Sequence, residues 1–223
     1  MQKTAERTFN NMSEKKIGYN DAYSLKTPED SKKLYKKWAK TYDKDFALNS
    51  NYLSPKKISS FFNKHSRKTD SPILDVGAGT GLVGELLYKK NKKIIGIDIS
   101  SEMLEQAKLK ECYSELIEAD ITKKIPLKNN SIGAVVSAGT FTHGHVGADA
   151  FDELLRITKP GGLFVLSINS KVFINGGFQK KFLKIKNKIS SPIFKEFNAH
   201  AENKNKKFNE IKIFASIFRK KLK

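Results

Sequence analysis

One short stretch combines an acidic residue with three glycines at alternating positions: Asp75, Gly77, Gly79 and Gly81. The apolar run before it predicts a buried strand, and the glycines predict a tight turn that opens a helix near Leu82. Glycine suits a turn whose backbone must approach a ligand closely, because a Cβ would obstruct that approach. The pattern therefore predicts a nucleotide-binding turn whose backbone N–H groups face the ligand.

The same stretch can be aligned in two ways, and the choice decides the ligand. From Gly79 to Gly84 it fits GxGxxG, and Asp98 lies near the spacing of a ribose-binding acid in a dinucleotide fold. From Asp75 it fits DxGxGxG, with a carboxylate ahead of the first glycine. That carboxylate would repel a pyrophosphate but suits a cationic ligand. S-adenosylmethionine carries a sulfonium and an ammonium and no phosphate, so it is the coherent choice, with a NAD-dependent oxidoreductase as the alternative.

The stretch from Asp75 to Gly81 resembles motif I of the class I S-adenosylmethionine-dependent methyltransferases. Three later segments keep the order of that family: 94–98 resembles its second strand, 118–121 the end of its third, and 159–162 its turn into strand five. The resemblance covers residues 27–170. It implies a Rossmann-like, mostly parallel seven-stranded sheet with helices on both faces and an antiparallel C-terminal edge hairpin.

The resemblance also assigns residues to S-adenosyl-L-methionine. It implies that Asp75 and the glycines hold the methionine part, that Asp98 binds the ribose hydroxyls, and that Asp120 and Ile121 flank the adenine. An acid suits a cis-diol because one carboxylate can accept two hydrogen bonds, although Asp98 could instead cap the next helix. Further candidates near these segments are Ile99, Ala138 and Met103, of which Met103 could instead be a core residue.

The helix predicted after Thr27-Pro28-Glu29-Asp30 is amphipathic and rich in aromatic residues. Its pattern resembles a subgroup related to the methyltransferase-like protein of the Williams–Beuren syndrome region. That resemblance implies a lid over the cofactor, and aromatic faces suit a sulfonium, whereas the alternative is that the aromatic residues only cap the core. One apolar stripe predicts a helix that continues through Leu34, Tyr35, Trp38, Ala39, Tyr42 and Phe46, and Asp43 belongs to the same lid pattern.

The loop expected after the fourth strand runs from Ala138 to His145 and should carry the chemistry. It lacks the Asn/Asp-Pro-Pro-Tyr motif of family members that methylate amino groups of nucleic acids. His143 could act as a general base, or both loop histidines could simply be solvated. With only His143 and His145 at this spacing, no metal site is expected. A small-molecule acceptor is therefore expected, and an RNA methyltransferase or a non-catalytic RNA-binding module is the alternative.

The formal net charge of +19 is unevenly distributed. Residues 1–70 hold 16 basic and 8 acidic side chains, residues 71–170 hold 11 and 12, and residues 171–223 hold 15 and 3. The flanks could form a basic rim for an anionic substrate or a nucleic acid. Nearly all of the basic residues are lysine, whereas arginine is preferred for phosphate contacts, so a compositional bias is the favoured explanation of the charge.

Length and composition predict one α/β domain, with residues 1–26 as a flexible arm, 27–70 as a helical lid and 71–223 as the methyltransferase domain. A lone cysteine, Cys112, excludes an internal disulfide and fits a reducing compartment. The first residues lack the apolar core of a signal peptide, and no apolar run approaches the ~20 residues of a membrane span. A cytoplasmic protein is therefore expected, and its oligomeric state is left open.

Overall fold

The computed structural model describes residues 17–18, 21–22, 24–25, 27–88, 93–202, 208 and 210–222. Most of the arm predicted over residues 1–26 lies outside these ranges. Within it, Ala22 and Leu25 are buried, so this short piece of the N-terminal segment packs against the body of the protein.

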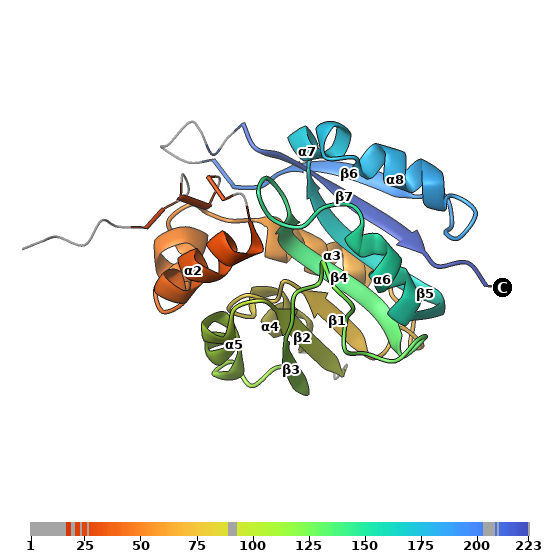
Figure 1. Ribbon diagram of the computed structural model, residues 1–223, viewed down its shortest axis with the longest axis horizontal. Helices are drawn as coiled ribbons and strands as arrows, with labels where there is room; N and C mark the ends of the chain where they lie inside the picture. Colours follow the sequence, from red (N-terminus) through yellow and green to blue (C-terminus); the bar gives the residue numbers. More distant parts are fainter. Residues whose placement is uncertain are drawn as a thin grey trace, which may run out of the picture.

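A seven-stranded sheet forms the centre of the molecule, in the order β3-β2-β1-β4-β5-β7-β6 (Figure 1). The first five strands in this order are parallel, and β7 pairs antiparallel with both β5 and β6. The structure thus confirms the predicted Rossmann-like sheet and its antiparallel C-terminal hairpin. The strands are β1 (Ile73–Val76), β2 (Ile94–Asp98), β3 (Glu115–Glu118), β4 (Ile132–Phe141), β5 (Thr158–Asn169), β6 (Ile193–Asn198) and β7 (Lys212–Arg219).

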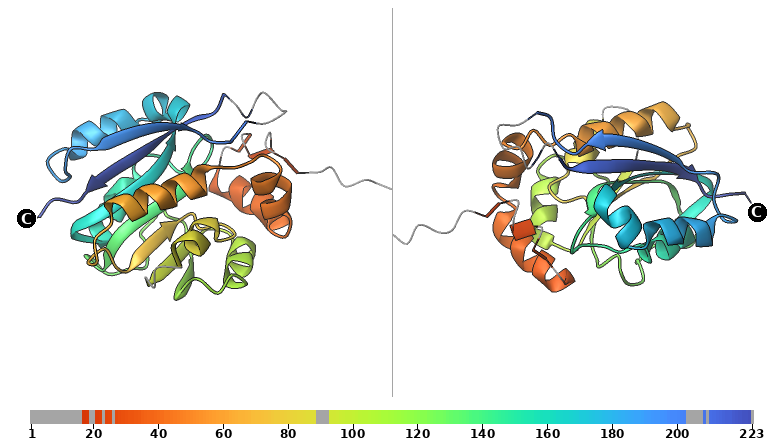
Figure 2. Two further views of the ribbon diagram at one scale, coloured as in Figure 1. Left: turned by 180° about the vertical axis from the view of Figure 1, so that it is seen from behind. Right: turned by 90° about the horizontal axis from the view of Figure 1, so that it is seen from above.

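Helices cover both faces of the sheet (Figures 1 and 2). On one face α3 (Ser54–His65) and α4 (Leu82–Tyr88) pack on Ile73 and its neighbours. On the other, α6 (Ala150–Ile157), α7 (Ser170–Asn175) and α8 (Phe178–Ile185) cover the cluster that contains Leu74. Burial on both faces explains why the central strands are continuous apolar runs rather than alternating ones.

The helix α2 (Pro28–Trp38) begins where the sequence predicts. Thr27 Oγ1 accepts from the Asp30 N–H at 3.1 Å, and the Asp30 carboxylate accepts from the Thr27 N–H at 3.1 Å. This reciprocal capping satisfies two of the free N–H groups at the helix start. Hydrogen bonds between neighbouring residues therefore fix the start of α2.

The predicted continuation of that helix to Phe46 is wrong. The α-helix ends at Trp38, and after a turn the chain forms a π-helix, η1 (Asp43–Leu48). The wider π turn accompanies a ring cluster in which Trp38, Tyr42 and Phe46 lie 5.0–5.5 Å apart between centroids. The spacing of apolar residues does not predict this ring packing, which accompanies the change from an α-helix to a π-helix.

The helix α5 (Ser101–Lys108) follows β2 and starts at the predicted cap. There, Ser100 Oγ accepts from the Met103 N–H at 3.3 Å. The short helix α7 was not expected from the sequence, whereas α8 begins after the predicted break at Gly177. None of the helices in the described ranges is both long and apolar enough to span a bilayer.

Candidate active site

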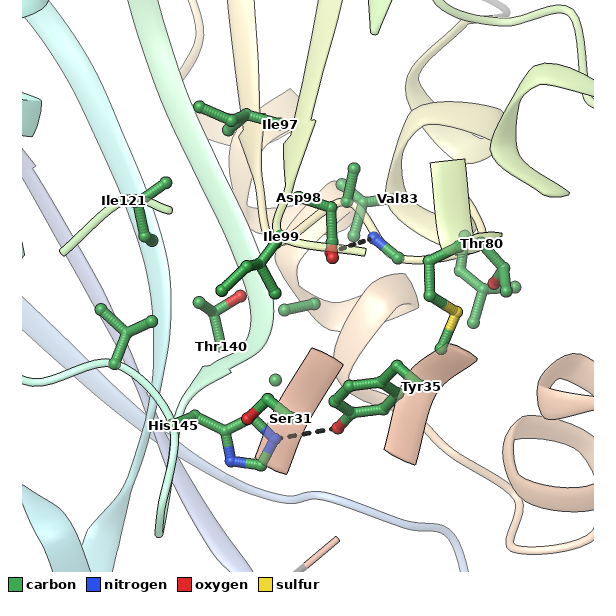
Figure 3. A pocket seen from close by; sticks show the side chains of 18 of the residues that line it. Ser31, Tyr35, Thr80, Val83, Ile97, Asp98, Ile99, Ile121, Thr140 and His145 are labelled. Carbon is green, nitrogen blue, oxygen red and sulfur yellow. Dashed lines mark hydrogen bonds between the residues drawn. The ribbon is translucent and has the colours of Figure 1, made fainter. Parts of the chain in front are cut away.

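A cavity of about 130 Å³ opens at the carboxyl ends of β1, β2, β3 and β4 and is covered by α2 (Figure 3). In parallel sheets ligands bind at this edge, which is where the sequence placed the chemistry. The sequence-predicted residues in its wall are Tyr35, Tyr42, Gly77, Gly79, Asp98, Ile99, Met103, Asp120, Ile121 and Ala138. The wall does not contain Trp38, Asp75, Gly81 or His143.

Asp98 is held rigidly at the end of β2. One carboxylate oxygen, Oδ2, accepts from the Gly79 N–H at 2.9 Å (Figure 3). The other, Oδ1, accepts from the Ser100 N–H at 2.9 Å. Burial raises the pKa of Asp98, while these backbone hydrogen bonds lower it. Each carboxylate oxygen has a second lone pair, so Asp98 can still accept hydrogen bonds from a diol in the cavity.

The glycine turn after β1 brings bare backbone to the cavity. Gly77 has a φ of +64°, and a Cβ there would lie 2.1 Å from Thr140 Oγ1. Gly79 has a φ of +54°, and a Cβ there would meet nothing within 4 Å, so it would project into open space. Only glycine combines this backbone conformation with close approach of a ligand.

The other two glycines of the stretch serve Tyr113 rather than the cavity. A Cβ at Gly81 would lie 3.0 Å from the Tyr113 ring, and one at Gly84 would lie 2.3 Å from it. A Cβ at Gly96 on β2 would also lie 3.0 Å from the Tyr113 ring, so these three glycines leave the slot that the ring fills. The third glycine of the GxGxxG alignment is therefore explained by the packing of one aromatic ring, which removes its weight as a dinucleotide signature.

Asp75 also belongs to this slot, and the expectation that it faces a cationic ligand does not match its placement. Its side chain is 1% exposed, and Oδ2 accepts from the Tyr113 hydroxyl at 2.7 Å. Burial raises the pKa of Asp75 to about 7; the Tyr113 hydrogen bond opposes this shift, and the nearby charge of Asp98 adds to it. The acid at the start of the motif is thus a buried, titratable group behind the turn.

The raised pKa of Asp75 predicts a pH-dependent stability. Between about pH 4 and pH 7 the native state keeps a proton that the unfolded state releases, so the free energy of unfolding falls as pH rises. In Asp75→Asn this contribution is gone. Its stability relative to wild type should rise by about 1 kcal/mol per pH unit over that window and level off above it. Urea unfolding at a series of pH values measures this difference.

Tyr113→Phe provides the matched variant for this test. It removes the hydrogen bond that lowers the pKa of Asp75, so the decline in stability should extend to higher pH than in wild type. Equal pH slopes in wild type and Asp75→Asn would contradict the interpretation.

The side of the cavity that the family resemblance assigns to adenine is formed after β3. Asp120 Oδ1 accepts from the Thr122 N–H at 2.9 Å and from the Thr122 hydroxyl at 2.6 Å, which fixes the turn. Ile121 and Ile99 bring apolar surface to the same cavity (Figure 3). Two apolar side chains beside a carboxylate suit a flat, polar-edged base.

The aromatic side of the cavity comes from the N-terminal helices. Tyr35 and Tyr42 lie in its wall, and burial raises the pKa of Tyr42 well above its usual value, so its hydroxyl stays neutral. Trp38 instead faces a neighbouring second cavity. Tyr52 lines the main cavity as well, although no motif in the sequence marks it as functional.

A polar network joins these N-terminal helices to the glycine turn. Asp43 accepts hydrogen bonds from the Thr80 hydroxyl and from Lys110 Nζ, the latter at 2.8 Å. Lys110 also contacts Glu85 at 3.1 Å. Asp43, which belongs to the same sequence pattern as the aromatic residues, thus anchors η1 above the turn.

The loop after β4 places the two histidines differently. The side chain of His143 is exposed and outside the cavity, whereas His145 lies in the wall with its Nε2 2.9 Å from the Tyr35 hydroxyl (Figure 3). Gly144 between them has a φ of +72°, and a Cβ there would lie 1.9 Å from the Leu25 carbonyl oxygen. The turn is therefore set by a contact distant in sequence, which is why the sequence alone does not predict that His145, rather than His143, lines the cavity.

Comparison with known proteins relates the central part of this chain to methyltransferases. Residues 74–166 match the family described as a methyltransferase domain. Among solved structures, a TehB-like S-adenosylmethionine-dependent methyltransferase from Corynebacterium glutamicum has the same fold, with a TM-score of 0.57 and 18% identity over 87% of this chain and 100% of that one. The name of that structure gives S-adenosylmethionine as the cofactor of that protein.

Two curated relatives are similar over shorter segments. An uncharacterized methyltransferase of Schizosaccharomyces pombe is 29% identical over 56% of this chain and 49% of its own length. A demethylmenaquinone methyltransferase of Renibacterium salmoninarum is 33% identical over 43% of this chain and 40% of its own length. The chain thus matches half or less of the length of these relatives.

Proposed function

We propose that this protein transfers the sulfonium methyl group of S-adenosyl-L-methionine to a small-molecule acceptor. One observation carries the proposal: a single cavity brings together the bare backbone at Gly79, the acid at the end of β2 and the apolar pair Ile99 and Ile121. These features lie at the same edge of the sheet although the sequence separates them by more than 40 residues. A nucleoside with a charged tail requires such a combination.

Each residue has a role that its geometry permits. Asp98 accepts hydrogen bonds from the ribose hydroxyls through its remaining lone pairs, and the turn at Gly77 and Gly79 borders the methionine part. Ile99 and Ile121 flank the adenine, with Asp120 at its edge. The rings of Tyr35 and Tyr42 offer π faces to the positive charge. These assignments carry over the roles that the family resemblance implies.

The chemistry requires alignment more than a set of reactive groups. The bound cofactor supplies a methyl group that is already activated by its positive sulfur. The residues of this chain hold two reactants in register and exclude water, and such positioning can account for much of a rate enhancement. We infer that α2 acts as the lid, because Pro28, Ser31 and Tyr35 cover the cavity from one side.

A small acceptor is favoured over RNA by the residues that line this site. The described residues of the cavity wall include no lysine or arginine, although the chain is strongly basic. The name of the Renibacterium relative specifies demethylmenaquinone, a small molecule, as acceptor. We further propose that the chain belongs to the subgroup related to the Williams–Beuren region protein, on the strength of the Tyr35 to Asp43 pattern and its place over the cavity.

Calorimetric titration tests the cofactor directly. S-adenosylmethionine and S-adenosylhomocysteine should bind, and NAD(H) should not. Binding of NAD(H) alone would overturn the proposal. The acceptor is then sought by incubating the protein with methyl-labelled cofactor and a cell extract separated into metabolite, protein and RNA fractions. Label is expected in the metabolite fraction, and label confined to RNA would replace the small-molecule acceptor by the RNA alternative.

A further inference from the structure

A second cavity, of about 60 Å³, adjoins the first. It reaches from the first cavity toward the sheet at β5 and β7, where Asn169 and Ile213 line it. Its free volume is roughly four or more times what one water molecule needs, so a small chemical group fits. Five residues line both cavities and form the junction between them: Tyr35, Tyr42, Tyr52, Gly139 and His145. Two molecules, one in each cavity, would meet at this junction.

The protonation of His145 follows from its partners. Its Nδ1 lies 2.7 Å from the His143 carbonyl oxygen, which can only accept, so Nδ1 carries the proton. Its Nε2 therefore accepts from the Tyr35 hydroxyl at 2.9 Å. Burial lowers the pKa of His145, although the hydrogen bond to the His143 carbonyl opposes this shift. His145 thus presents a lone pair on Nε2 at the junction.

The wall of the second cavity is aromatic and uncharged. Among the described residues that line it there is no aspartate, glutamate, lysine or arginine. His200, at its far side, donates from Nδ1 to the Ser50 carbonyl oxygen at 3.0 Å, and burial lowers its pKa to about 4, so it is neutral. An ionised ligand would lose its hydration here without a counter-charge. The wall therefore selects an uncharged group.

Two buried polar atoms in the same wall lack a hydrogen-bond partner among the described residues. They are the Trp38 Nε1 and the Thr142 Oγ1. Both atoms have almost no accessible surface, so they lie within the packed wall rather than facing the free volume. A ligand O–H or S–H instead finds its partner in His145 Nε2 at the junction, so the cavity suits a small ring or chain that carries such a group.

We propose that the second cavity is the acceptor subsite, and that His145 Nε2 takes the proton of an uncharged acceptor bearing a hydroxyl or thiol. This inference rests on the methyltransferase function proposed above. The acceptor O–H or S–H replaces the Tyr35 hydroxyl as the donor to Nε2, which places its oxygen or sulfur at the junction.

The transfer step exchanges one bond to the methyl carbon for another. The acceptor oxygen or sulfur uses a lone pair to form the new bond to the methyl carbon, and the bond between that carbon and the cofactor sulfur breaks with its electron pair left on sulfur. The acceptor proton moves to His145 Nε2. The imidazolium formed then loses one proton to solvent, which restores the neutral ring.

Binding is tested without turnover, in the protein saturated with S-adenosylhomocysteine. Phenol and thiophenol should bind, as measured by ligand-observed NMR, and benzoate and benzylammonium should bind at least tenfold more weakly. Ala199→Leu and Ile213→Phe each fill only the second cavity, so at least one of them should weaken phenol binding tenfold while S-adenosylhomocysteine affinity stays unchanged. Binding of benzoate equal to that of phenol, or phenol binding that neither variant alters, would overturn the subsite. Failure of S-adenosylhomocysteine itself to bind would instead overturn the function proposed above.

The role of His145 is tested by pH profiles with thiophenol and phenol as acceptors. The titratable groups that face the two cavities with it are Tyr35, Tyr42, Tyr52, Asp98, Asp120 and His200. In wild type, kcat should rise with pH through the pKa of His145, below the ordinary histidine value, and then level off.

His145→Gln should lower kcat by about 100-fold or more and remove that rise. His143→Gln is the matched control: its side chain lies outside both cavities, so the wild-type profile should remain. A separate measurement is the 15N shift of the His145 ring in the S-adenosylhomocysteine complex, which should report an unprotonated Nε2. A proton on Nε2, or an unaltered profile in His145→Gln, would overturn this role.

Discussion

Asp98→Ala is expected to weaken S-adenosylmethionine binding by about 1.5–3 kcal/mol, roughly 10- to 150-fold, as measured by calorimetric titration. The carboxylate lies at the end of β2 in the cavity wall, and its two backbone hydrogen bonds leave lone pairs for a diol. Hydrogen bonds to a charged acceptor are worth more than neutral ones, so their loss should dominate the affinity. Glu115→Ala removes an exposed acid from the neighbouring strand and should leave affinity unchanged.

Asp98 also positions the Gly79 N–H, so a loss of affinity could reflect a displaced turn rather than a lost contact with the ribose. A double-mutant cycle separates the two causes. S-adenosylhomocysteine and its 2′-deoxyribose analogue are titrated into wild type and Asp98→Ala. If the carboxylate binds the ribose, removing the hydroxyl should cost affinity in wild type and little in the variant. Equal costs in both proteins would show that Asp98 acts on the turn alone.

Features encoded by neighbouring residues were predictable from the sequence. The capping box between Thr27 and Asp30 fixes the start of α2, and Ser100 caps α5 where expected. Asp98 was placed correctly in the cavity wall because it is the last residue of its strand, where the chain turns toward the sheet edge. Short-range hydrogen bonds and strand ends do not depend on the rest of the fold.

Asp75 shows where the argument from spacing fails. It lies inside β1 rather than at its end, so its side chain points away from the plane of the sheet and not along the strand. Alternation puts it on the same face as Ile73, which packs in the cluster containing the α4 residue Val83. The period of two in a strand would have predicted this burial, and it outweighs the electrostatic argument.

Other residues were beyond prediction because contacts distant in sequence place them. The turn that brings His145 into the wall depends on Leu25 lying against Gly144. Trp38 lines the second cavity rather than the first. It is the last residue of α2, after which the chain turns into the π-helix η1. A helical stripe identifies the residues of an aromatic cluster but not the direction in which each ring faces.

The C-terminal edge hairpin, formed by β6 and β7, is tied to the segment before β1 by an ion pair whose acid is buried. Arg219 donates to both carboxylate oxygens of Asp70, at 2.8 and 3.0 Å, and also to the carbonyl oxygens of His65 and Gly161, each at 2.8 Å. Asp70 is 2% exposed. The planar guanidinium thus joins the end of α3, the entry to β1 and the turn within β5, and a lysine could not make these four contacts.

Asp70→Asn should lower the free energy of unfolding by about 3 kcal/mol, measured by urea denaturation. The reason is that the variant leaves the partly buried guanidinium of Arg219 without its counter-charge, and breaking such a pair costs far more than the pair contributes. Glu196→Gln, which removes the exposed ion pair with Lys212 on the same hairpin, should cost less than 1 kcal/mol. Equal effects of the two variants would show that Asp70 does not anchor the edge.

Replacing both partners, as in Asp70→Leu with Arg219→Met, should recover part of the stability lost in Asp70→Asn, because no uncompensated charge remains. The same variants separate stability from function. Asp70 precedes β1, whereas the cavity lies beyond its carboxyl end, so S-adenosylhomocysteine affinity measured well below the unfolding transition should match wild type. If Asp70→Asn weakened that affinity, the two ends of β1 would be coupled, and the cavity would depend on the sheet edge as well as on its own turn.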